Sequence, residues 1–115
     1  MAGYQLIETE QYQKIVFNGD ITIDASMQFK DELKERLHAA AQKRFIVDMQ
    51  AVPFMDSSGL GMLISMFKEV NELQGQIVYY GFQDYVLRLL KLVKLDQVFT
   101  IATDEAAAEA QLKNE

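Results

Sequence analysis

A stretch near the middle of the chain, residues 52–62 with the sequence VPFMDSSGLGM, constrains the fold more than any other. A continuous apolar run at residues 45–47 leads into it, and apolar residues at helical spacing over residues 60–73 lead out of it. The pattern predicts a buried strand, then a helix, with two hydroxyls and a carboxylate at the junction. Because a helix N-terminus exposes unpaired N–H groups and the positive end of the helix dipole, this junction is suited to holding or sensing a phosphate.

The chain before the junction predicts two strands and a helix. Residues 4–9 and 14–17 have strand composition, and we place the first of them at a sheet edge. A turn signal at residues 18–20 ends the second strand, and Asp24 or Ser26 is available to cap the helix that follows. The apolar stripe of that helix is Phe29, Leu33, Leu37 and Ala40 or Ala41.

After the junction, helical and strand patterns alternate. Residues 77–80 predict a strand, residues 86–93 a helix and residues 98–101 a short fifth strand. Thr103 is expected to cap a last helix, which is rich in alanine and which we therefore place at the periphery. A strand, a helix and a further strand over this length form a right-handed βαβ unit, so the later strands are expected to be parallel.

These patterns together predict an α/β fold. We expect residues 1–115 to form one domain, because this length supports one modest core. The sheet is expected to be mixed, with four or five strands, an antiparallel opening pair, and three or four helices packed against it.

Composition excludes several classes of function. The formal net charge of −6 argues against a nucleic-acid partner and against docking on anionic lipid. The chain has no cysteine and one histidine, His38, which argues against thiol chemistry, a metal site and a Ser-His-Asp triad, and we expect no cofactor. No signal peptide pattern and no apolar stretch of membrane-spanning length is present, so we expect a cytoplasmic protein.

The hydroxyl of Ser57 has two interpretations. As a phosphate acceptor, it would place close to two negative charges at a helix N-terminus, where the dipole favours them and the Asp56 carboxylate opposes them. As a helix cap, it would stabilise the helix by about 1 kcal/mol. The two roles are compatible, and the sequence leaves both open.

Gly59 and Gly61 stand close to the start of the predicted helix, where each is about 1 kcal/mol less favourable than alanine. They suggest that something approaches the backbone closely, or that helix and sheet pack tightly. No lysine follows them until Lys68, so the stretch is not a nucleotide-hydrolysing phosphate loop. A nucleophile elbow is also excluded, because Met55 rather than glycine stands two residues before Ser57.

Met62 and Met66 widen the apolar stripe of the same helix beyond what a core-facing helix needs. They either pack under a loop or a neighbouring helix, or they form a partner-binding edge, to which methionine is suited because its side chain is adaptable. The sequence leaves these two alternatives open.

Residues 54–61, FMDSSGLG, resemble the signature of the bacterial STAS-domain anti-sigma factor antagonists. The resemblance covers nearly the whole chain, since the turn at residues 19–21, the strand at residues 45–48 and the segment 86–99 fall in matching order. Two positions depart from the family pattern. Thr22 stands where the family often has an aspartate near the phosphorylated serine, and Lys94 stands where many members have glycine.

The resemblance implies a partner switch. The first serine after the aspartate, here Ser57, would be phosphorylated by an anti-sigma factor that is also a serine kinase, and a serine phosphatase would restore it. Only the unphosphorylated form would bind the anti-sigma factor. The partner-binding residues expected on this basis, with the two methionines added from their place on the helix, are Asp56, Ser57, Ser58, Gly59, Met62 and Met66.

Two other functions remain as alternatives. The chain could be a constitutive STAS scaffold in a larger signalling or transport assembly, without phosphorylation. It could also be a small enzyme using Asp56 and Ser57, but no general base pairs with them in the sequence, and we predict no catalytic residue. We expect a monomer or a weak dimer.

Overall fold

The computed structural model describes residues 2–113, which form a five-stranded mixed sheet with the strands in chain order. The β1–β2 pair is antiparallel and the other pairs are parallel. This confirms the predicted fold class, the edge position of the first strand and the parallel βαβ unit. The elements are β1 (Gly3–Glu8), β2 (Gln13–Asn18), α1 (Ile23–Ala39), β3 (Arg44–Ala51), α2 (Ser57–Glu72), β4 (Gln76–Tyr80), α3 (Asp84–Leu92), the 3₁₀ helix η1 (Leu95–Gln97), β5 (Ile101–Ala102) and α4 (Glu105–Lys113).

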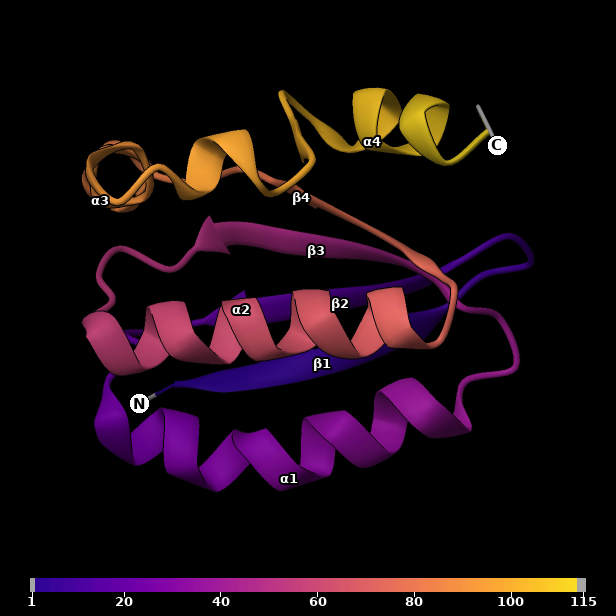
Figure 1. Cartoon of the computed structure of the whole chain (residues 1–115), viewed down its shortest axis with the longest axis horizontal. Coiled ribbons are helices and arrows are strands. Elements are labelled where there is room, and N and C mark those ends of the chain that lie inside the picture. The colour runs from indigo at the N-terminus through magenta and orange to yellow at the C-terminus, as the bar shows by residue number, and fades with distance from the viewer. Residues whose placement is uncertain (1, 114–115) are drawn as a thin grey trace.

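The helices cover both faces of the sheet, with α1 and α2 side by side on one face and α4 on the other (Figure 1). The central strand β3 shows why its sequence is continuously apolar. Phe45 and Val47 belong to the core beneath α1 and α2, whereas Ile46 belongs to the smaller core beneath α4, and all three are fully buried. A strand buried on both faces has no polar face to show.

Both helix caps predicted outside the junction were wrong. Thr22 is the N-cap residue of α1, and the Ser26 hydroxyl donates to the Thr22 carbonyl oxygen at 2.9 Å from inside the helix. Asp104, not Thr103, caps α4, because its Oδ1 accepts the Ala107 N–H at 2.8 Å. The residue that caps a helix is easily assigned one or a few positions away from the correct one. Several polar residues near a helix start have side chains of a kind that can cap it.

The predicted strand at residues 98–101 was mostly wrong, because only Ile101–Ala102 forms β5. Val98 is half exposed after η1, whereas Phe99 is buried and its ring centroid lies 4.7 Å from that of Tyr79. An apolar residue that enters the core from a turn produces the same short run as a buried strand.

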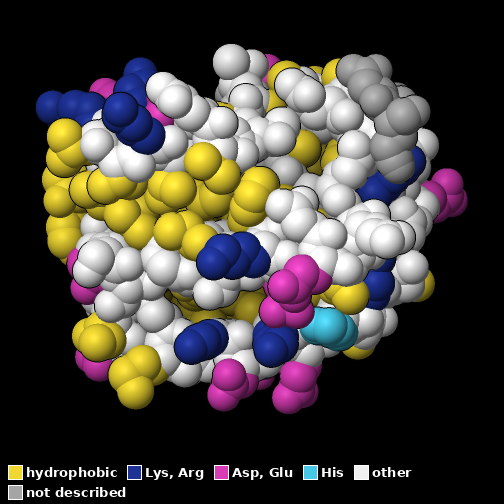
Figure 2. Space-filling view, in the orientation of Figure 1, with side chains coloured by type: hydrophobic (Ala, Val, Ile, Leu, Met, Phe, Trp, Pro, Cys, Tyr) yellow, Lys and Arg dark blue, Asp and Glu magenta, His cyan; other side chains and the backbone are white. Residues whose placement is uncertain are grey.

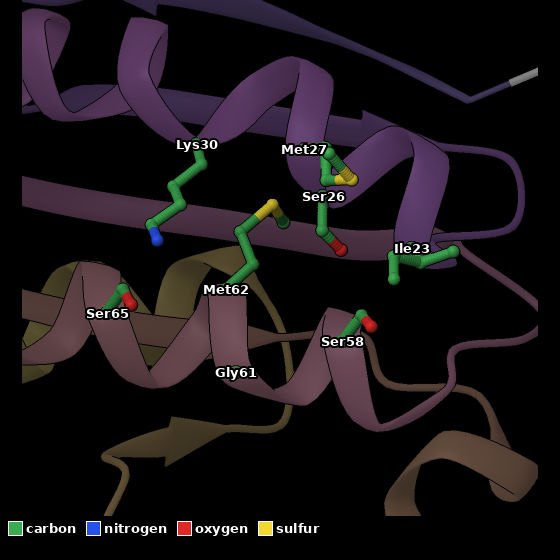
Figure 3. Close-up of a pocket in the computed structure, with 8 residues that line it drawn as sticks. All are labelled: Ile23, Ser26, Met27, Lys30, Ser58, Gly61, Met62 and Ser65. Atoms are coloured by element: carbon green, nitrogen blue, oxygen red, sulfur yellow. The ribbon is translucent and has the colours of Figure 1, made fainter.

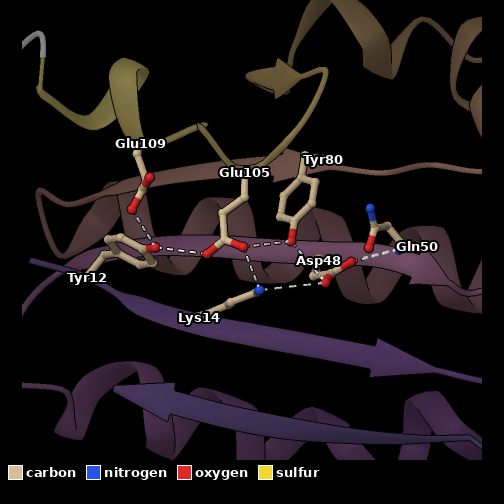
Figure 4. A network of polar contacts seen from close by, with 7 residues as sticks. All are labelled: Tyr12, Lys14, Asp48, Gln50, Tyr80, Glu105 and Glu109. Carbon is tan, nitrogen blue, oxygen red and sulfur yellow. Dashed lines mark hydrogen bonds and ion pairs between the residues drawn. The ribbon is translucent and has the colours of Figure 1, made fainter. Parts of the chain in front are cut away.

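The last helix is less peripheral than its alanine content predicted. Ala108 and Leu112 of α4 are buried against the sheet. A polar network beneath the helix joins it to three strands (Figure 4). Its members are Tyr12, Lys14, Asp48, Gln50, Tyr80, Glu105 and Glu109.

Glu105 is the centre of this network. Its Oε1 lies 2.8 Å from the Lys14 ammonium and its Oε2 accepts the Tyr12 hydroxyl at 2.9 Å. The hydrogen bond from Lys14 outweighs burial and lowers the pKa of Glu105. Nearby, burial raises the pKa of Tyr80 to about 12, and the Tyr80 hydroxyl donates to Asp48 at 3.0 Å. The bonds that Lys14 and Tyr12 make to Glu105 hold α4 on the sheet.

A first prediction concerns the turn after α3. Lys94 has a φ of 65°, in the left-handed region that a β-carbon disfavours by roughly 1–2 kcal/mol. Lys94→Gly is expected to raise the free energy of unfolding by about 0.5–1 kcal/mol, measured by urea denaturation. Lys94→Ala is the control, since it removes the charge and keeps the strain, and it should stay near wild type. A lower midpoint for Lys94→Gly would contradict this account.

A second prediction concerns pH. The folded state holds Glu105 ionised through Lys14, so its contribution is present above the unfolded pKa and is lost as pH falls through the lowered folded pKa. Glu105→Gln should lower the urea midpoint at about pH 7, and the difference from wild type should shrink by about pH 3. A difference that is independent of pH would show that packing, not the ion pair, holds α4.

Candidate functional site

The junction lies where the chain leaves the central strand and enters α2. Asp56 is the N-cap residue, and its Oδ1 accepts the N–H groups of Ser58 at 2.9 Å and Gly59 at 3.2 Å. The alternative in which Ser57 caps the helix was therefore wrong. Ser57 is the first residue of α2, it is exposed, and its hydroxyl has no hydrogen-bond partner among residues 2–113. A carboxylate accepts two amides more strongly than a hydroxyl does, which leaves the serine hydroxyl free.

The loop that precedes α1 holds the junction in place. Ile21 forms an isolated parallel bridge with Met55. The Ile21 N–H donates to the Phe54 carbonyl oxygen at 3.0 Å, and the Asp56 N–H donates to the Ile21 carbonyl oxygen at 3.3 Å. Thr22, the position at which the chain departs from the family pattern, follows directly and begins α1. The N-termini of α1 and α2 therefore start from one pair of hydrogen-bonded loops.

The two glycines of the motif have different roles. A β-carbon at Gly59 would lie 2.6 Å from the Ile21 carbonyl oxygen and 3.0 Å from the Met55 β-carbon. The close approach predicted from the sequence is thus confirmed at Gly59. At Gly61 no described residue comes close, since a β-carbon there would meet nothing within 4 Å, so tight packing inside the domain does not explain this glycine.

Gly61 faces a groove between α1 and α2 with a volume of about 330 Å³ (Figure 3). The groove begins beside the junction, since Ser58 lines one end of it. Ile23 and Met27 stand at its rim with 55% and 73% of their surface exposed. The lining residues are Ile23, Ser26, Met27, Lys30, Ser58, Gly61, Met62 and Ser65.

Met62 and Met66 lie on the floor between the two helices and are only 5% and 3% exposed. Both belong to the main core, so the packing alternative describes their position. A partner contact by these methionines stays a prediction, and it is limited to the small part of each side chain that the grooves expose.

Charged side chains surround the farther part of the groove. The His38 Nε2 lies 2.7 Å from Glu69, and Lys34 lies 3.8 Å from the same carboxylate. Figure 2 shows the recess between α1 and α2 with these basic and acidic groups and the histidine around it. The α1 wall of the groove was not predicted from the sequence. Met27, an apolar residue on the polar face of that helix, was the one signal available.

A second exposed apolar surface lies on the α3 side of the molecule (Figure 2). Tyr85 and Leu92 of α3 are 47% and 80% exposed, and the Phe54 ring stacks on Tyr85 with 5.4 Å between centroids. No sequence pattern singled out this surface. It connects Phe54, the first residue of the motif, with α3.

Neither a metal site nor a membrane span is found in the part of the chain that the structure describes. Within residues 2–113, no three histidine or acidic side chains are grouped so that they could hold a metal ion. Within the same residues, no helix is both long enough and apolar enough to cross a bilayer.

The family model of the STAS domain matches residues 6–108, and the match includes the whole junction and both helices of the groove. The chain belongs to the STAS-domain family. This STAS domain is 32% identical over 77 residues to an anti-sigma-B factor antagonist of Listeria monocytogenes, an alignment that covers 64% of this chain and 68% of that protein.

Solved structures show the same fold. A crystal structure of a putative anti-sigma factor antagonist from Thermotoga maritima superimposes with a TM-score of 0.89 at 17% identity, covering 96% of this chain and 95% of that one. The Bacillus cell fate determinant SpoIIAA in its phosphorylated form gives a TM-score of 0.72 at 21% identity, covering 95% and 99%. At these identities the likeness concerns the fold.

A third prediction separates the two glycines. Gly59→Ala should lower the free energy of unfolding by more than about 2 kcal/mol, because the backbone at Ile21 and Met55 must move to admit the methyl group. Gly61→Ala is the matched control in the same helix and should raise it by about 0.5–1 kcal/mol, since nothing obstructs the methyl group. Urea denaturation measures both, and equal effects would refute the distinction.

Proposed function

We propose that this STAS domain is an anti-sigma factor antagonist that works as a phosphorylation-controlled partner switch. The unphosphorylated form binds an anti-sigma factor that is also a serine kinase. Phosphorylation of Ser57 releases that partner, and a serine phosphatase restores the binding form. The observation that supports this most is the free, exposed hydroxyl of Ser57 at the first position of α2, beside a cap supplied by Asp56.

The physical basis of the switch is local. A phosphate on Ser57 carries close to two negative charges, and the α2 N-terminus stabilises them by about 0.3–2 kcal/mol. The domain therefore tolerates the modification. A partner docked over the junction would have to desolvate the phosphate beside the Asp56 carboxylate, and each 1.4 kcal/mol of that cost weakens binding about tenfold. No refolding of the domain is required.

The partner surface in this proposal is centred on the start of α2. Asp56, Ser57, Ser58 and Gly59 shape the docking surface, and Met62 and Met66 contribute from the floor between the helices. Gly59 acts through the backbone, because it lets the turn at Ile21 pack against the junction.

In this proposal the domain is a binding module of the cytoplasm and not an enzyme. Ser57 is the substrate of the partner's kinase activity. The described residues offer Ser57 no general base, because the nearest carboxylate in the chain, Asp56, is engaged as the helix cap. A serine nucleophile requires a base within hydrogen-bond reach.

The decisive test measures binding of the domain to every anti-sigma factor serine kinase encoded in its genome. Wild type and Ser57→Asp are compared side by side by calorimetry, in the absence of ATP. We expect one kinase to bind wild type and to bind Ser57→Asp at least about 100-fold more weakly, because the acidic side chain imitates part of the phosphate charge. With ATP, mass spectrometry should find one phosphate on wild type, located at Ser57.

The controls separate the switch from its alternatives. Ser58→Ala changes the neighbouring hydroxyl and should still be labelled, whereas Ser57→Ala should not be. Labelling of Ser57→Ala would show that the acceptor is another residue. Equal binding of wild type and Ser57→Asp would favour the constitutive scaffold, and failure of every kinase to bind would overturn the antagonist assignment.

A further inference from the structure

Gly61 is a glycine that the fold of this domain does not need. It is exposed in the second turn of α2, and a β-carbon there would meet nothing within 4 Å. Glycine weakens a helix relative to alanine. No contact among residues 2–113 requires the missing side chain, so packing within the domain does not account for this glycine.

The space above Gly61 is the groove between α1 and α2. Two large apolar side chains of α1, Ile23 and Met27, stand at its rim and are mostly exposed. Met62 of α2 adds an apolar side chain on the floor of the groove (Figure 3). A groove lined by these apolar side chains, with the bare backbone of Gly61 beside them, fits an apolar side chain better than a polar one.

A free cation lies at the end of the groove away from Ser58. Lys30 extends from α1 toward α2 near Ser65 (Figure 3), and it makes no ion pair or hydrogen bond with any residue that the structure describes. Lys34, one turn further along α1, is paired with Glu69 at 3.8 Å. In a chain with a net charge of −6, an unpaired lysine beside an apolar groove complements a carboxylate on the incoming partner.

We propose that the α1–α2 groove receives an apolar side chain of the anti-sigma factor, followed by an acidic residue that pairs with Lys30. The inference rests on the proposed function, because the groove is continuous with the Ser57 junction through Ser58. Gly61 keeps the groove open for the partner, although glycine makes the helix less stable than alanine would at this position. The unphosphorylated Ser57 junction and the occupied groove are then two ends of one interface.

The test uses the kinase identified by the binding experiment above. Its dissociation constant is measured with wild type, Gly61→Ala, Gly61→Gln and Lys30→Glu. We expect Gly61→Ala to raise the melting temperature by roughly 2–6 °C and to weaken binding by about tenfold, with Gly61→Gln weakening it further. A variant that folds more stably and binds less well cannot owe its weaker binding to unfolding.

Two control variants match these changes elsewhere on the surface. Asn71→Ala improves the helix propensity of α2 at an exposed position away from the groove, and it should leave binding unchanged. Lys91→Glu makes the same charge change as Lys30→Glu, but on the exposed face of α3. Lys30→Glu should weaken binding by about tenfold and Lys91→Glu by less than about twofold.

The outcomes distinguish this inference from the function on which it rests. If wild type binds and neither Gly61→Ala nor Gly61→Gln changes the affinity, the proposal that the groove receives a partner side chain is overturned. The antagonist function would remain intact. A loss with Lys91→Glu as large as that with Lys30→Glu would place the partner's acidic contact on α3 instead, or attribute it to net charge. Absence of wild-type binding to any kinase would remove the proposed function itself.

Discussion

The Asp56 carboxylate accepts the N–H groups of Ser58 and Gly59, and the geometry of the candidate site depends on those two hydrogen bonds. They define where α2 begins and satisfy N–H groups that a helix start otherwise leaves without a partner. Because the cap belongs to Asp56, the Ser57 hydroxyl is exposed and has no hydrogen-bond partner within residues 2–113. The same carboxylate is the negative group that a phosphate at Ser57 would face.

The second constraint is that the start of α2 is joined to the start of α1. Ile21 and Met55 pair as neighbouring strands do, and Gly59 lets the backbone of Ile21 come close. The two helices consequently leave from one point and lie side by side, with the groove between them. On the opposite face, the Glu105 network holds α4 through contacts remote in the fold from the junction, so stability there is separated from the proposed binding surface.

Much of the fold was predictable because its signals are local. The continuous apolar run in β3 reflects burial on both faces, and alternating helical and strand patterns specify parallel connections of one hand. The short strand β5 was placed too early because Phe99 enters the core from a turn, which a pattern of hydrophobicity cannot distinguish from a strand. The cap of α1 was misplaced because the helix begins after Thr22 with no side-chain cap hydrogen bond, so neither Asp24 nor Ser26 marks its start.

For the site, the sequence by itself determined that two serines and an aspartate stand between a buried strand and a helix, and it identified Ser57 as the candidate acceptor. Only the tertiary structure decided that Asp56 takes the cap, that Gly59 is required by the fold, and that Gly61 opens onto a groove. The reason is that these properties depend on Ile21 and the α1 helix, which are distant in the chain. A sequence motif specifies which groups are neighbours in the chain. The space around each group is determined by the helices and strands that pack against it.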